Sequence, residues 1–384
     1  MTGATIIDLD PTSIEQLTRE LDEIYDSTIA DLGERDERYI RRMIRAQRSL
    51  AVGSRVLMLA GAALRRRGVV GRKVATHPAG TALLGVGTVG LGLAKILENM
   101  EIGHNVMHGQ WDWMNDPEIN STVWEWDTVC PSDQWKHGHN LIHHTWTNVR
   151  GMDRDIGYEI MRTTSSTRWH PAYLVQPVYN TLLGLLFEWG VGVHEIDIRR
   201  LPRATAEERA TQLELFRGFL RKARRQVAKD YVLWPALAGP GFVDVAVADA
   251  VASIIRNVWS YMIIFCGHFP DGVHVFERKV VEDETRGGWY VRQILGSANI
   301  AGGPKFHILA GNLSHQIEHH LFPDMPSRRY QQVAPRVKAL CARYELPYNS
   351  KPLWRQFGET TRKIWRYALP GGRDVVNEAP RWAA

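Results

Sequence analysis

The apolar residues of this chain are gathered into a few long stretches that strongly polar stretches separate. Residues 80–100, GTALLGVGTVGLGLAKILENM, carry no charge before Lys95, and residues 243–267 are nearly as apolar. At about 1.5 Å per residue, a helix of either length can cross the roughly 30 Å hydrocarbon layer of a membrane. The pattern therefore predicts an integral membrane protein with a large aqueous part.

The hydrophobic pattern predicts about four membrane spans, near residues 50–65, 79–100, 231–247 and 249–267. The last two are expected to form a hairpin that turns near AGPGFVD (238–244), because glycine and proline interrupt the apolar run there. Residues 50–64 are short for a span, and basic residues flank them on both sides, so a single spanning helix there conflicts with the positive-inside rule. Residues 172–193 contain Pro177 and Glu188 and are expected at the membrane interface.

The rest of the chain is polar. Residues 1–48 are expected to form a cytosolic helical segment and residues 346–384 a cytosolic tail, on either side of a membrane domain at 49–345. THPAG (76–80) is interpreted as the start of a helix. The predicted fold class is all-α, with membrane helices that carry a cytosolic helical cap.

Composition narrows the chemistry that the chain can perform. The only cysteines are Cys130, Cys266 and Cys341, with no CxxC pair, which excludes a disulfide framework, a cysteine zinc site or an iron–sulfur cluster made by this chain alone. The net charge of +5 suits a surface near anionic lipid headgroups or a dock for an acidic substrate, and we expect no nucleic-acid partner.

Histidine is the residue type whose placement is unusual. Nine of the 15 histidines fall into three clusters and one isolated position. The clusters are HNVMH with His104 and His108, HNLIHH with His139, His143 and His144, and SHQIEHH with His315, His319 and His320, and the isolated position is His268 at the end of the last apolar run.

These histidines have the character of metal ligands. His104 and His108, spaced i and i+4, stack on one face of a helix. Eight or nine imidazoles are too many for one catalytic ion that keeps a position open, so they suit two, and imidazole binds iron, zinc, copper or nickel. A zinc hydrolase would favour HExxH, which is absent, and only one ExxH pair of the di-iron bundle type occurs, Glu101 to His104. A dinuclear, nitrogen-rich site beside a membrane indicates iron and oxygen chemistry on a lipid chain.

The three clusters resemble the histidine boxes of the membrane-bound fatty acid desaturase family and of related hydroxylases. The resemblance covers roughly residues 80–345 in order and spacing, and QIEHHLFPDMPSRRY (316–330) is its most specific part. NMEIGHNVMHGQWDWMNDP and HTWTNVRGMDRDIGY resemble the bacterial stearoyl-CoA delta-9 type. The resemblance implies that the boxes face the cytosol and bind two iron ions (Fe²⁺), with His268 as the ligand contributed between the last span and the third box.

Two departures leave alternatives open. Gln316 stands where many members have a histidine, and His315, one residue earlier, either fills that place or lies in a second shell. His139 has the spacing seen in related alkane hydroxylases, which leaves hydroxylation open. The outer nitrogens of ligating histidines need partners, and the second-shell candidates are Gln316, Glu318, Asp153, Asp155 and His137.

The resemblance implies oxygen-dependent desaturation of a long-chain fatty acyl-CoA, stearoyl or palmitoyl, at the delta-9 position. Electrons are expected from a separate ferredoxin or flavin/iron–sulfur reductase, and the enzyme is expected in the bacterial cell membrane, among membrane lipids, with its metal site on the cytosolic side. The alternatives are a hydroxylase, a front-end acyl-lipid desaturase and, in a different class, a zinc membrane hydrolase. Substrate-binding residues are not assigned, and the tryptophans between the first two boxes are either interface anchors or walls of an acyl tunnel: Trp111, Trp113, Trp124, Trp126 and Trp135.

Overall fold

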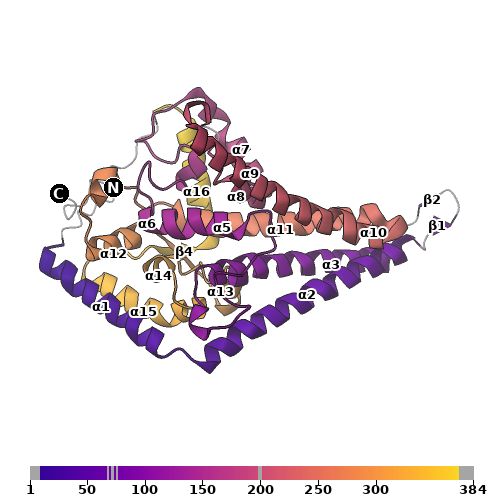
Figure 1. Ribbon diagram of the computed structural model, residues 1–384, viewed down its shortest axis with the longest axis horizontal. Helices are drawn as coiled ribbons and strands as arrows, with labels where there is room; N and C mark the ends of the chain where they lie inside the picture. Colours follow the sequence, from indigo (N-terminus) through magenta and orange to yellow (C-terminus); the bar gives the residue numbers. More distant parts are fainter. Residues whose placement is uncertain (1–8, 67–68, 71–72, 75–76, 198–200, 372–384) are drawn as a thin grey trace.

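A stalk of long helices projects from a broader helical base (Figure 1). The computed structural model describes residues 9–66, 69–70, 73–74, 77–197 and 201–371. Over these residues the chain is mostly helical and its strands are two or three residues long, which confirms the predicted all-α class. The stalk contains α2 (Glu34–Arg66), α3 (Pro78–Ile96), α9 (Ala206–Val227), α10 (Trp234–Leu237) and α11 (Phe242–His268).

Three segments of the chain are π-helical, and each continues an α-helix. Segment η1 (Leu97–His104) continues α3 into the base, and η7 (Ala228–Leu233) joins α9 to α10. Segment η3 (Lys136–His143) follows α5 (Ser132–Trp135). A π-helical turn is rare and occurs most often at functional sites, and two of these three end at a histidine of the predicted boxes.

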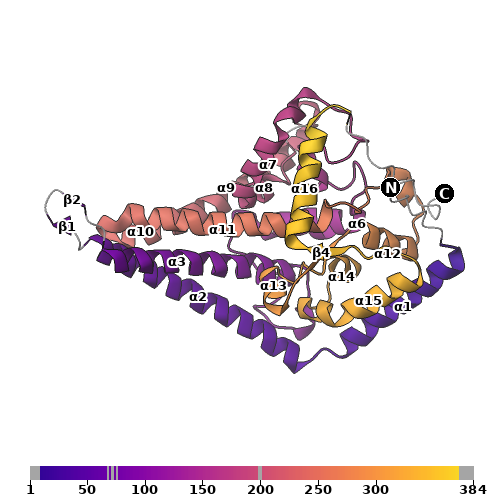
Figure 2. The same ribbon diagram turned by 180° about the vertical axis from the view of Figure 1, so that it is seen from behind.

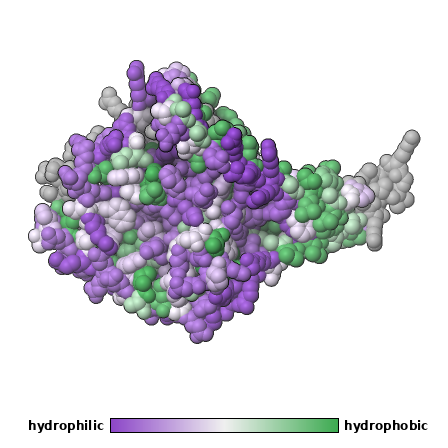
Figure 3. All heavy atoms as spheres, in the orientation of Figure 1, coloured by the Kyte–Doolittle hydropathy of each residue, from purple (hydrophilic) through white to green (hydrophobic). Residues whose placement is uncertain are grey.

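The surface of the stalk is apolar. Among the described residues, two helical stretches are long and apolar enough to cross a membrane, residues 78–107 and 239–268. Figure 3 shows hydrophobic side chains over the stalk and hydrophilic ones over much of the base. Exposed apolar side chains of the stalk include Val52, Val56, Val86, Val89, Val243, Val247 and Val251. An apolar surface of this extent suits contact with lipid rather than with water.

The predicted first span is part of a longer helix. Residues 50–65 form the second half of α2, which begins at Glu34, so the boundary predicted between residues 48 and 49 lies inside one helix. The helix is continuous because its sequence contains no proline, and single glycines such as Gly53 lower helix stability without ending the helix.

The chain turns where the hairpin was predicted, and the helices on either side of the turn have bounds that differ from the predicted ones. The chain turns at η8 (Gly239–Gly241), inside the predicted 238–244. The predicted span 231–247 is not one helix, because this Gly-Pro-Gly turn divides it. Its last residues belong to α11, which begins at Phe242 rather than at 249, and its first residues end the helix that starts at Ala206.

Close backbone contact joins α2 to α3. A Cβ atom added at Gly87 would lie 2.7 Å from the carbonyl oxygen of Ser54, and one at Gly80 would lie 2.4 Å from the backbone nitrogen of Arg65. Small residues at such positions let two helices approach closely without a side chain between them. Helix α3 starts at Pro78, as THPAG predicted.

The base has its own hydrophobic core, formed by helices that lie away from the tip of the stalk (Figure 2). Asp10 caps α1 (Pro11–Ala30) through the backbone nitrogens of Thr12 and Ser13, and α1 buries Leu17 and Leu21. These side chains pack with those of α12 (Arg286–Leu295), α14 (Gln316–Leu321) and α15 (Tyr330–Arg343).

The turn between α1 and α2 is fixed by one buried arginine. Arg329 donates to Asp36 over 2.6 and 2.8 Å and to Asp31 over 2.8 Å. Its side chain is only 1% exposed, and that of Asp36 is fully buried. A bidentate pair of this kind holds the N-terminal helices against the start of α15.

Shorter elements complete the base and the tip. Residues 172–193 comprise the end of a 3-10 turn followed by two helices, α7 (Gln176–Leu185) and α8 (Phe187–Val193), which are broken at Leu186, so they do not make one span. The strands pair β1 (Val69–Val70) with β2 (Lys73–Val74) and β3 (Asn299–Ala301) with β4 (Ser350–Pro352). The remaining elements are α4 (Asn105–Met107), η2 (Asp112–Met114), α6 (His144–Trp146), η4 (Ile156–Glu159), η5 (Pro171–Val175), η6 (Leu201–Arg203), η9 (Arg278–Val281), α13 (Pro304–Leu309), η10 (Ser327–Arg329) and α16 (Leu353–Ala368).

Candidate metal centre

Four segments that are distant in the sequence bring histidines to one place where the stalk enters the base. They are η1 and α4 with His104 and His108, η3 and α6 with His139, His143 and His144, the end of α11 with His268, and α14 with His319 and His320. All eight rings lie in an unbroken network of ring contacts, with centroid separations of 4.4 to 6.5 Å.

The first box has the geometry that its spacing predicts. The rings of His104 and His108 lie 4.6 Å apart on one face, and the backbone nitrogen of His108 donates to the carbonyl oxygen of His104. The loop before α14 presses against this helix at Gly311. Its φ of +65° favours glycine, and an added Cβ would lie 2.4 Å from the carbonyl oxygen of Met100, so no larger residue fits.

The histidines form two groups of possible metal ligands. In each group the nitrogen atoms that face one another lie within 4.8 Å. One group is His104, His108, His139 and His319, and the other is His143, His268 and His320. Three or four nitrogen donors at this separation suit a transition-metal ion that imidazole binds.

His144 lies between the two groups. Its ring is 4.4 Å from that of His320, 4.7 Å from that of His108 and 4.7 Å from that of His319. Among the described residues, neither of its ring nitrogens has a hydrogen-bond partner, although both are buried.

The outer nitrogens of four histidines are held by acceptors. His143 Nδ1 lies 3.1 Å from Asp153, and His104 Nδ1 lies 3.0 Å from Asn105 Oδ1. Carboxylate and amide oxygens only accept, so Nδ1 carries the proton in each ring. The remaining pairs are His320 with Gln293 Oε1 at 3.0 Å and His319 with the hydroxyl of Tyr330 at 3.2 Å. Tyr330 itself donates to the carbonyl oxygen of Phe322, which leaves its oxygen free to accept.

The inner nitrogens have no such partner. Among the described residues, buried Nε2 atoms lack a hydrogen bond in five of the eight rings, those of His108, His143, His144, His319 and His320. A buried polar atom without a partner is destabilising. Several such atoms that face one another therefore indicate a bound group that satisfies them. Where an acceptor holds Nδ1, as in His143, His319 and His320, the proton lies on that atom and the inner lone pair faces the centre, and the donor set fits two ions.

Electrostatics keep most of these rings neutral. Burial lowers the pKa values of His108, His144, His319 and His320 well below the ordinary value, and repulsion from neighbouring imidazoles adds to it. His143 is the exception. Burial alone lowers its pKa, but the charges of Asp153 and Asp155 outweigh that effect and raise the pKa to about 9. A metal at this group would have to displace a proton from His143.

The structure does not place His315 with the other eight predicted ligands. Its ring lies 4.5 Å from that of His307, which accepts or donates a hydrogen bond at Ser314. Gln316 takes the position toward the centre, with its Nε2 atom 3.0 Å from His268 Nε2. Gln316 therefore fills the place that the sequence left open between these two residues.

The predicted outer residues divide into two sets. Asp153 contacts His143, and Asp155 lies 3.5 Å from His143 and 3.9 Å from His139. Glu318 instead accepts from Tyr348 and Asn299, and does not face the ligand nitrogens.

Two other polar residues also lie off the centre. His137 is largely exposed and contacts Glu195 at 2.8 Å. The carboxylate of Glu101, the acidic member of the only ExxH pair, accepts from Tyr39, Ser327 and Asn312 rather than from a histidine. The di-iron bundle motif is thus not used here.

Sequence reasoning missed three partners of the histidines. Asn105 directly follows a predicted ligand, and this adjacency was a usable signal. Gln293 and Tyr330 lie in helices with no motif that marks them, and only the packing of α12 and α15 brings them to His320 and His319.

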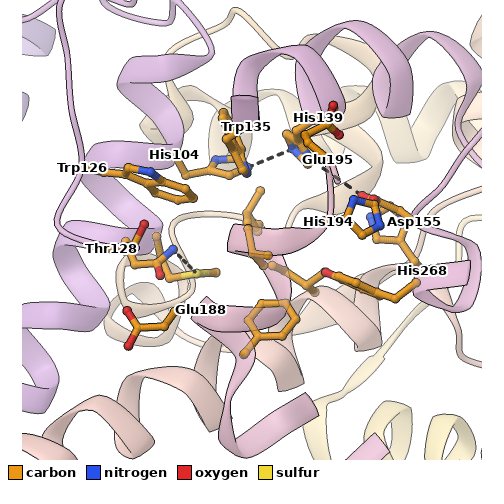
Figure 4. Close-up of a pocket in the computed structure, with 18 of the residues that line it drawn as sticks. His104, Trp126, Thr128, Trp135, His139, Asp155, Glu188, His194, Glu195 and His268 are labelled. Atoms are coloured by element: carbon orange, nitrogen blue, oxygen red, sulfur yellow. Dashed lines mark hydrogen bonds and ion pairs between the residues drawn. The ribbon is translucent and has the colours of Figure 1, made fainter. Parts of the chain in front are cut away.

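A mostly apolar cavity lies against the centre (Figure 4). About 860 Å³ of space free of atoms lies among its lining residues, a figure that includes the gaps between their side chains and open solvent. His104, His139 and His268 form one side of it, and Met100, Val191, Ile264 and Leu313 are among its apolar walls. A cavity of this character suits an acyl chain brought against the histidines.

The structure also separates the tryptophans of the predicted cluster. Trp126 and Trp135 line the cavity, and Trp135 stacks on His139 with 4.5 Å between the rings. Trp111 is fully buried in a different cluster, with Ile40 and Val106. Of the two readings left open, Trp126 and Trp135 are walls of the cavity rather than interface anchors.

Comparison with known proteins agrees with this geometry. The model of the fatty acid desaturase family matches residues 80–352. The NADPH-dependent stearoyl-CoA 9-desaturase of Mycobacterium tuberculosis is 46% identical over 378 residues, which cover 97% of this chain and 84% of that protein. The sn-1 linoleoyl-lipid 6-desaturase of Synechocystis sp. is 25% identical over 292 residues, 70% of this chain and 76% of that protein.

The family match includes all eight converging histidines and the cavity walls between residues 99 and 316. It confirms the resemblance that the three histidine boxes indicated. This chain belongs to the fatty acid desaturase family.

Proposed function

We propose that this protein is an oxygen-dependent desaturase of long-chain fatty acyl-CoA that forms a delta-9 double bond in a stearoyl or palmitoyl chain. The observation that carries the proposal is the convergence of eight histidines, five of them with unpartnered inner nitrogens among the described residues, beside an apolar cavity that three of them line. The substrate and the bond position rest on the 46% identical relative named a stearoyl-CoA 9-desaturase.

The proposed ligands hold two iron ions. His104, His108, His139 and His319 form the first set, and His143, His268 and His320 form the second, with His144 between them. His315 is left out of the set because its ring faces His307. When bound, the irons supply the oxygen-derived oxidant that an unactivated methylene requires, since no side-chain acid or base removes such a hydrogen.

The chain's own residues position the reactants. Asp153 holds His143 with its free nitrogen inward, and backbone nitrogens of Asn148 and Asp155 fix that carboxylate at 2.7 and 2.9 Å. The cavity wall brings a methylene of the acyl chain against the histidines and keeps water away from it. Trp135, stacked on His139, closes the wall beside the first ligand set.

The stalk is proposed to lie in the bacterial cell membrane and the base, with the metal centre, in the cytosol. The apolar surface of the stalk and its two helices of spanning length support this orientation. The basic half of α2, with Arg35, Arg38 and Arg42, lies at the base, where the positive-inside rule expects it. At the tip, Arg65 is paired with Asp244 over 2.8 Å.

Electrons are proposed to come from a separate ferredoxin or flavin/iron–sulfur reductase. The relative's name includes NADPH, and this chain contains GVGTVG at 85–90, which matches the glycine spacing of a dinucleotide-binding turn. That segment lies within α3, not between a strand and a helix, and Gly87 and Gly90 pack against α2. The glycines therefore serve helix packing, and the motif lacks the context it needs to bind NADPH.

Reconstitution tests the proposal. The purified protein, loaded with iron and supplied with oxygen, stearoyl-CoA and a reducing system, should yield a product two hydrogens lighter, with the double bond at carbon nine by mass spectrometry. A gain of one oxygen would indicate a hydroxylase instead. Metal analysis should give two irons per chain, and one zinc with no iron would support a zinc membrane hydrolase.

One observation supports a second candidate, a front-end desaturase of acyl lipids. One relative, 25% identical over 70% of this chain, is named an sn-1 linoleoyl-lipid 6-desaturase. Offering the enzyme stearoyl-CoA and a linoleoyl glycerolipid in competition decides between the two carriers.

A further inference from the structure

The cavity beside the metal centre has two chemically different ends. Helix α8 runs along it, with Glu188 at its start and His194 just past its end, roughly 9 Å apart along the helix (Figure 4). Glu195 at the second end contacts His137, whose side chain is 59% exposed, so this end faces solvent. The Glu188 end faces the stalk.

Glu188, which lines this end of the cavity, belongs to a buried ion pair. Arg256 of α11 lies 2.5 Å from the Glu188 carboxylate, and the two side chains are 1% and 6% exposed. Asn257 Oδ1 accepts from Arg256 Nε over 2.8 Å and from the backbone nitrogen of Glu188 over 3.3 Å. Asn257 also donates to the carbonyl oxygen of Leu185, so this residue of α11 links the ion pair to the end of α7.

Charged groups continue beyond this pair into the stalk. Arg55 pairs with Asp230 and Asp249, and Lys95 pairs with Asp230 over 2.6 Å. Along α11, Ile264 lies one turn before His268 and lines the cavity. Arg256 lies roughly 18 Å from His268 along the helix, and Asp249 lies further toward the tip of the stalk. These charges separate the cavity from the apolar core of the outer stalk.

A methyl terminus can displace an apolar side chain but not this pair. Pushing Glu188 aside would leave Arg256 buried and unpaired, which is strongly unfavourable in a site away from water. We propose that the Glu188–Arg256 ion pair is the floor of the acyl cavity and sets the longest chain that the enzyme accepts. This inference rests on the proposed function, because it takes the cavity to hold the acyl tail.

The test removes the whole pair. The double variant Glu188→Ala with Arg256→Met leaves no unpaired charge and opens the floor. Saturated acyl-CoAs of increasing length are added without an electron donor, and the ligand-induced rise in unfolding temperature is measured. The length that stabilises best should increase by about two or more carbons. In a separate competition with the reducing system supplied, the ratio of longer to shorter products should rise by about tenfold or more.

A matched control removes an ion pair that does not touch the cavity. Arg65→Met with Asp244→Ala breaks a pair between the same α11 and α2 near the tip of the stalk. The control should leave the preferred chain length unchanged. An equal shift in the control, or an unchanged preference in a folded Glu188→Ala/Arg256→Met protein, would overturn the proposal.

A second variant keeps the test decisive if the double variant does not fold. Val191 lines the cavity on α8, one helical turn from Glu188. Val191→Phe should shorten the preferred chain by filling the path to the floor, and no change would show that the tail does not run there. Failure of the proposed function is distinguishable, because the wild-type protein would then form no double bond at any chain length.

Discussion

At the scale of single residues, the direction of each imidazole decides what the centre can hold. Acceptors at Asn105, Asp153 and Gln293 require a proton on Nδ1 of the ring that each one contacts. The lone pair of Nε2 then faces inward, where metal binding replaces the missing hydrogen bond. The acceptors are thus as important to the centre as the histidines.

His319 and His315 are four positions apart, and replacing each by alanine should have very different effects on bound iron. His319→Ala removes an inward nitrogen from the first ligand set and is expected to lower bound iron to one ion per chain or less and to abolish product. His315→Ala is the matched control, because its ring faces His307, and it should retain two irons. Iron per chain, measured by plasma emission after gel filtration, checks the pair, and equal losses in both would contradict the ligand assignment.

Asp153→Asn tests the orienting carboxylate. The amide keeps the size of the side chain but can present its NH₂ group to His143, which favours the wrong ring tautomer. Loss of such an outer partner typically weakens metal affinity about 10–100-fold. Competition with a chelator of known affinity measures the change, and Glu318→Gln, whose carboxylate faces Tyr348, should leave iron affinity nearly intact.

At the scale of elements, the close contact between α2 and α3 fixes the position of α3, whose continuation η1 contains the start of the first histidine box. The glycines along α3 differ in their surroundings: Gly87 has no room for a Cβ, whereas Gly85 has nothing within 4 Å of that position. The same substitution at these two positions, two residues apart in one helix, separates packing from helix propensity.

Gly87→Ala should destabilise the protein by about 1–3 kcal/mol, because the methyl group collides with Ser54 and Met58 of α2. Gly85→Ala should be neutral or stabilising by up to about 1 kcal/mol, since alanine favours the helix. Apparent unfolding temperatures in the same detergent compare the two. A lower temperature for Gly85→Ala than for Gly87→Ala would refute the close packing.

At the scale of the whole molecule, the metal centre joins four segments that are distant in the sequence. The continuation of α3 through η1, the end of α11, the helical segment η3–α6 with the second box, and α14 of the base all supply histidines to it. Bound iron should therefore stabilise the molecule as a whole, because any ligand that binds only the folded state shifts the unfolding equilibrium.

Removal of iron should lower the unfolding temperature of the wild-type protein more than that of His319→Ala. A free metal concentration 100 times the dissociation constant stabilises by about 2.7 kcal/mol per site. Thermal unfolding with and without a chelator measures the difference. Equal shifts in both proteins would show that the metal does not tie the segments together.

The sequence alone predicted the chemistry of the centre more completely than its surroundings. The spacing of the boxes is local, so His104 and His108 fell on one face of a helix without reference to the rest of the chain. The helical class, the start of α3 and the turn at Gly239–Gly241 followed from periodicity and from proline and glycine positions. The length of α2 did not, because the change from polar to apolar residues near position 49 suggested a boundary where the helix continues.

Only the tertiary structure decided which polar residues complete the site. Gln316 rather than His315 faces His268, because the loop before α14 turns the earlier ring toward His307. Tyr330 and Gln293 reach the histidines from other helices, and Arg256 meets Glu188 across 68 positions of chain. Such pairings arise from how helices pack, and the identity of a residue carries no information about a neighbour that is distant in the sequence.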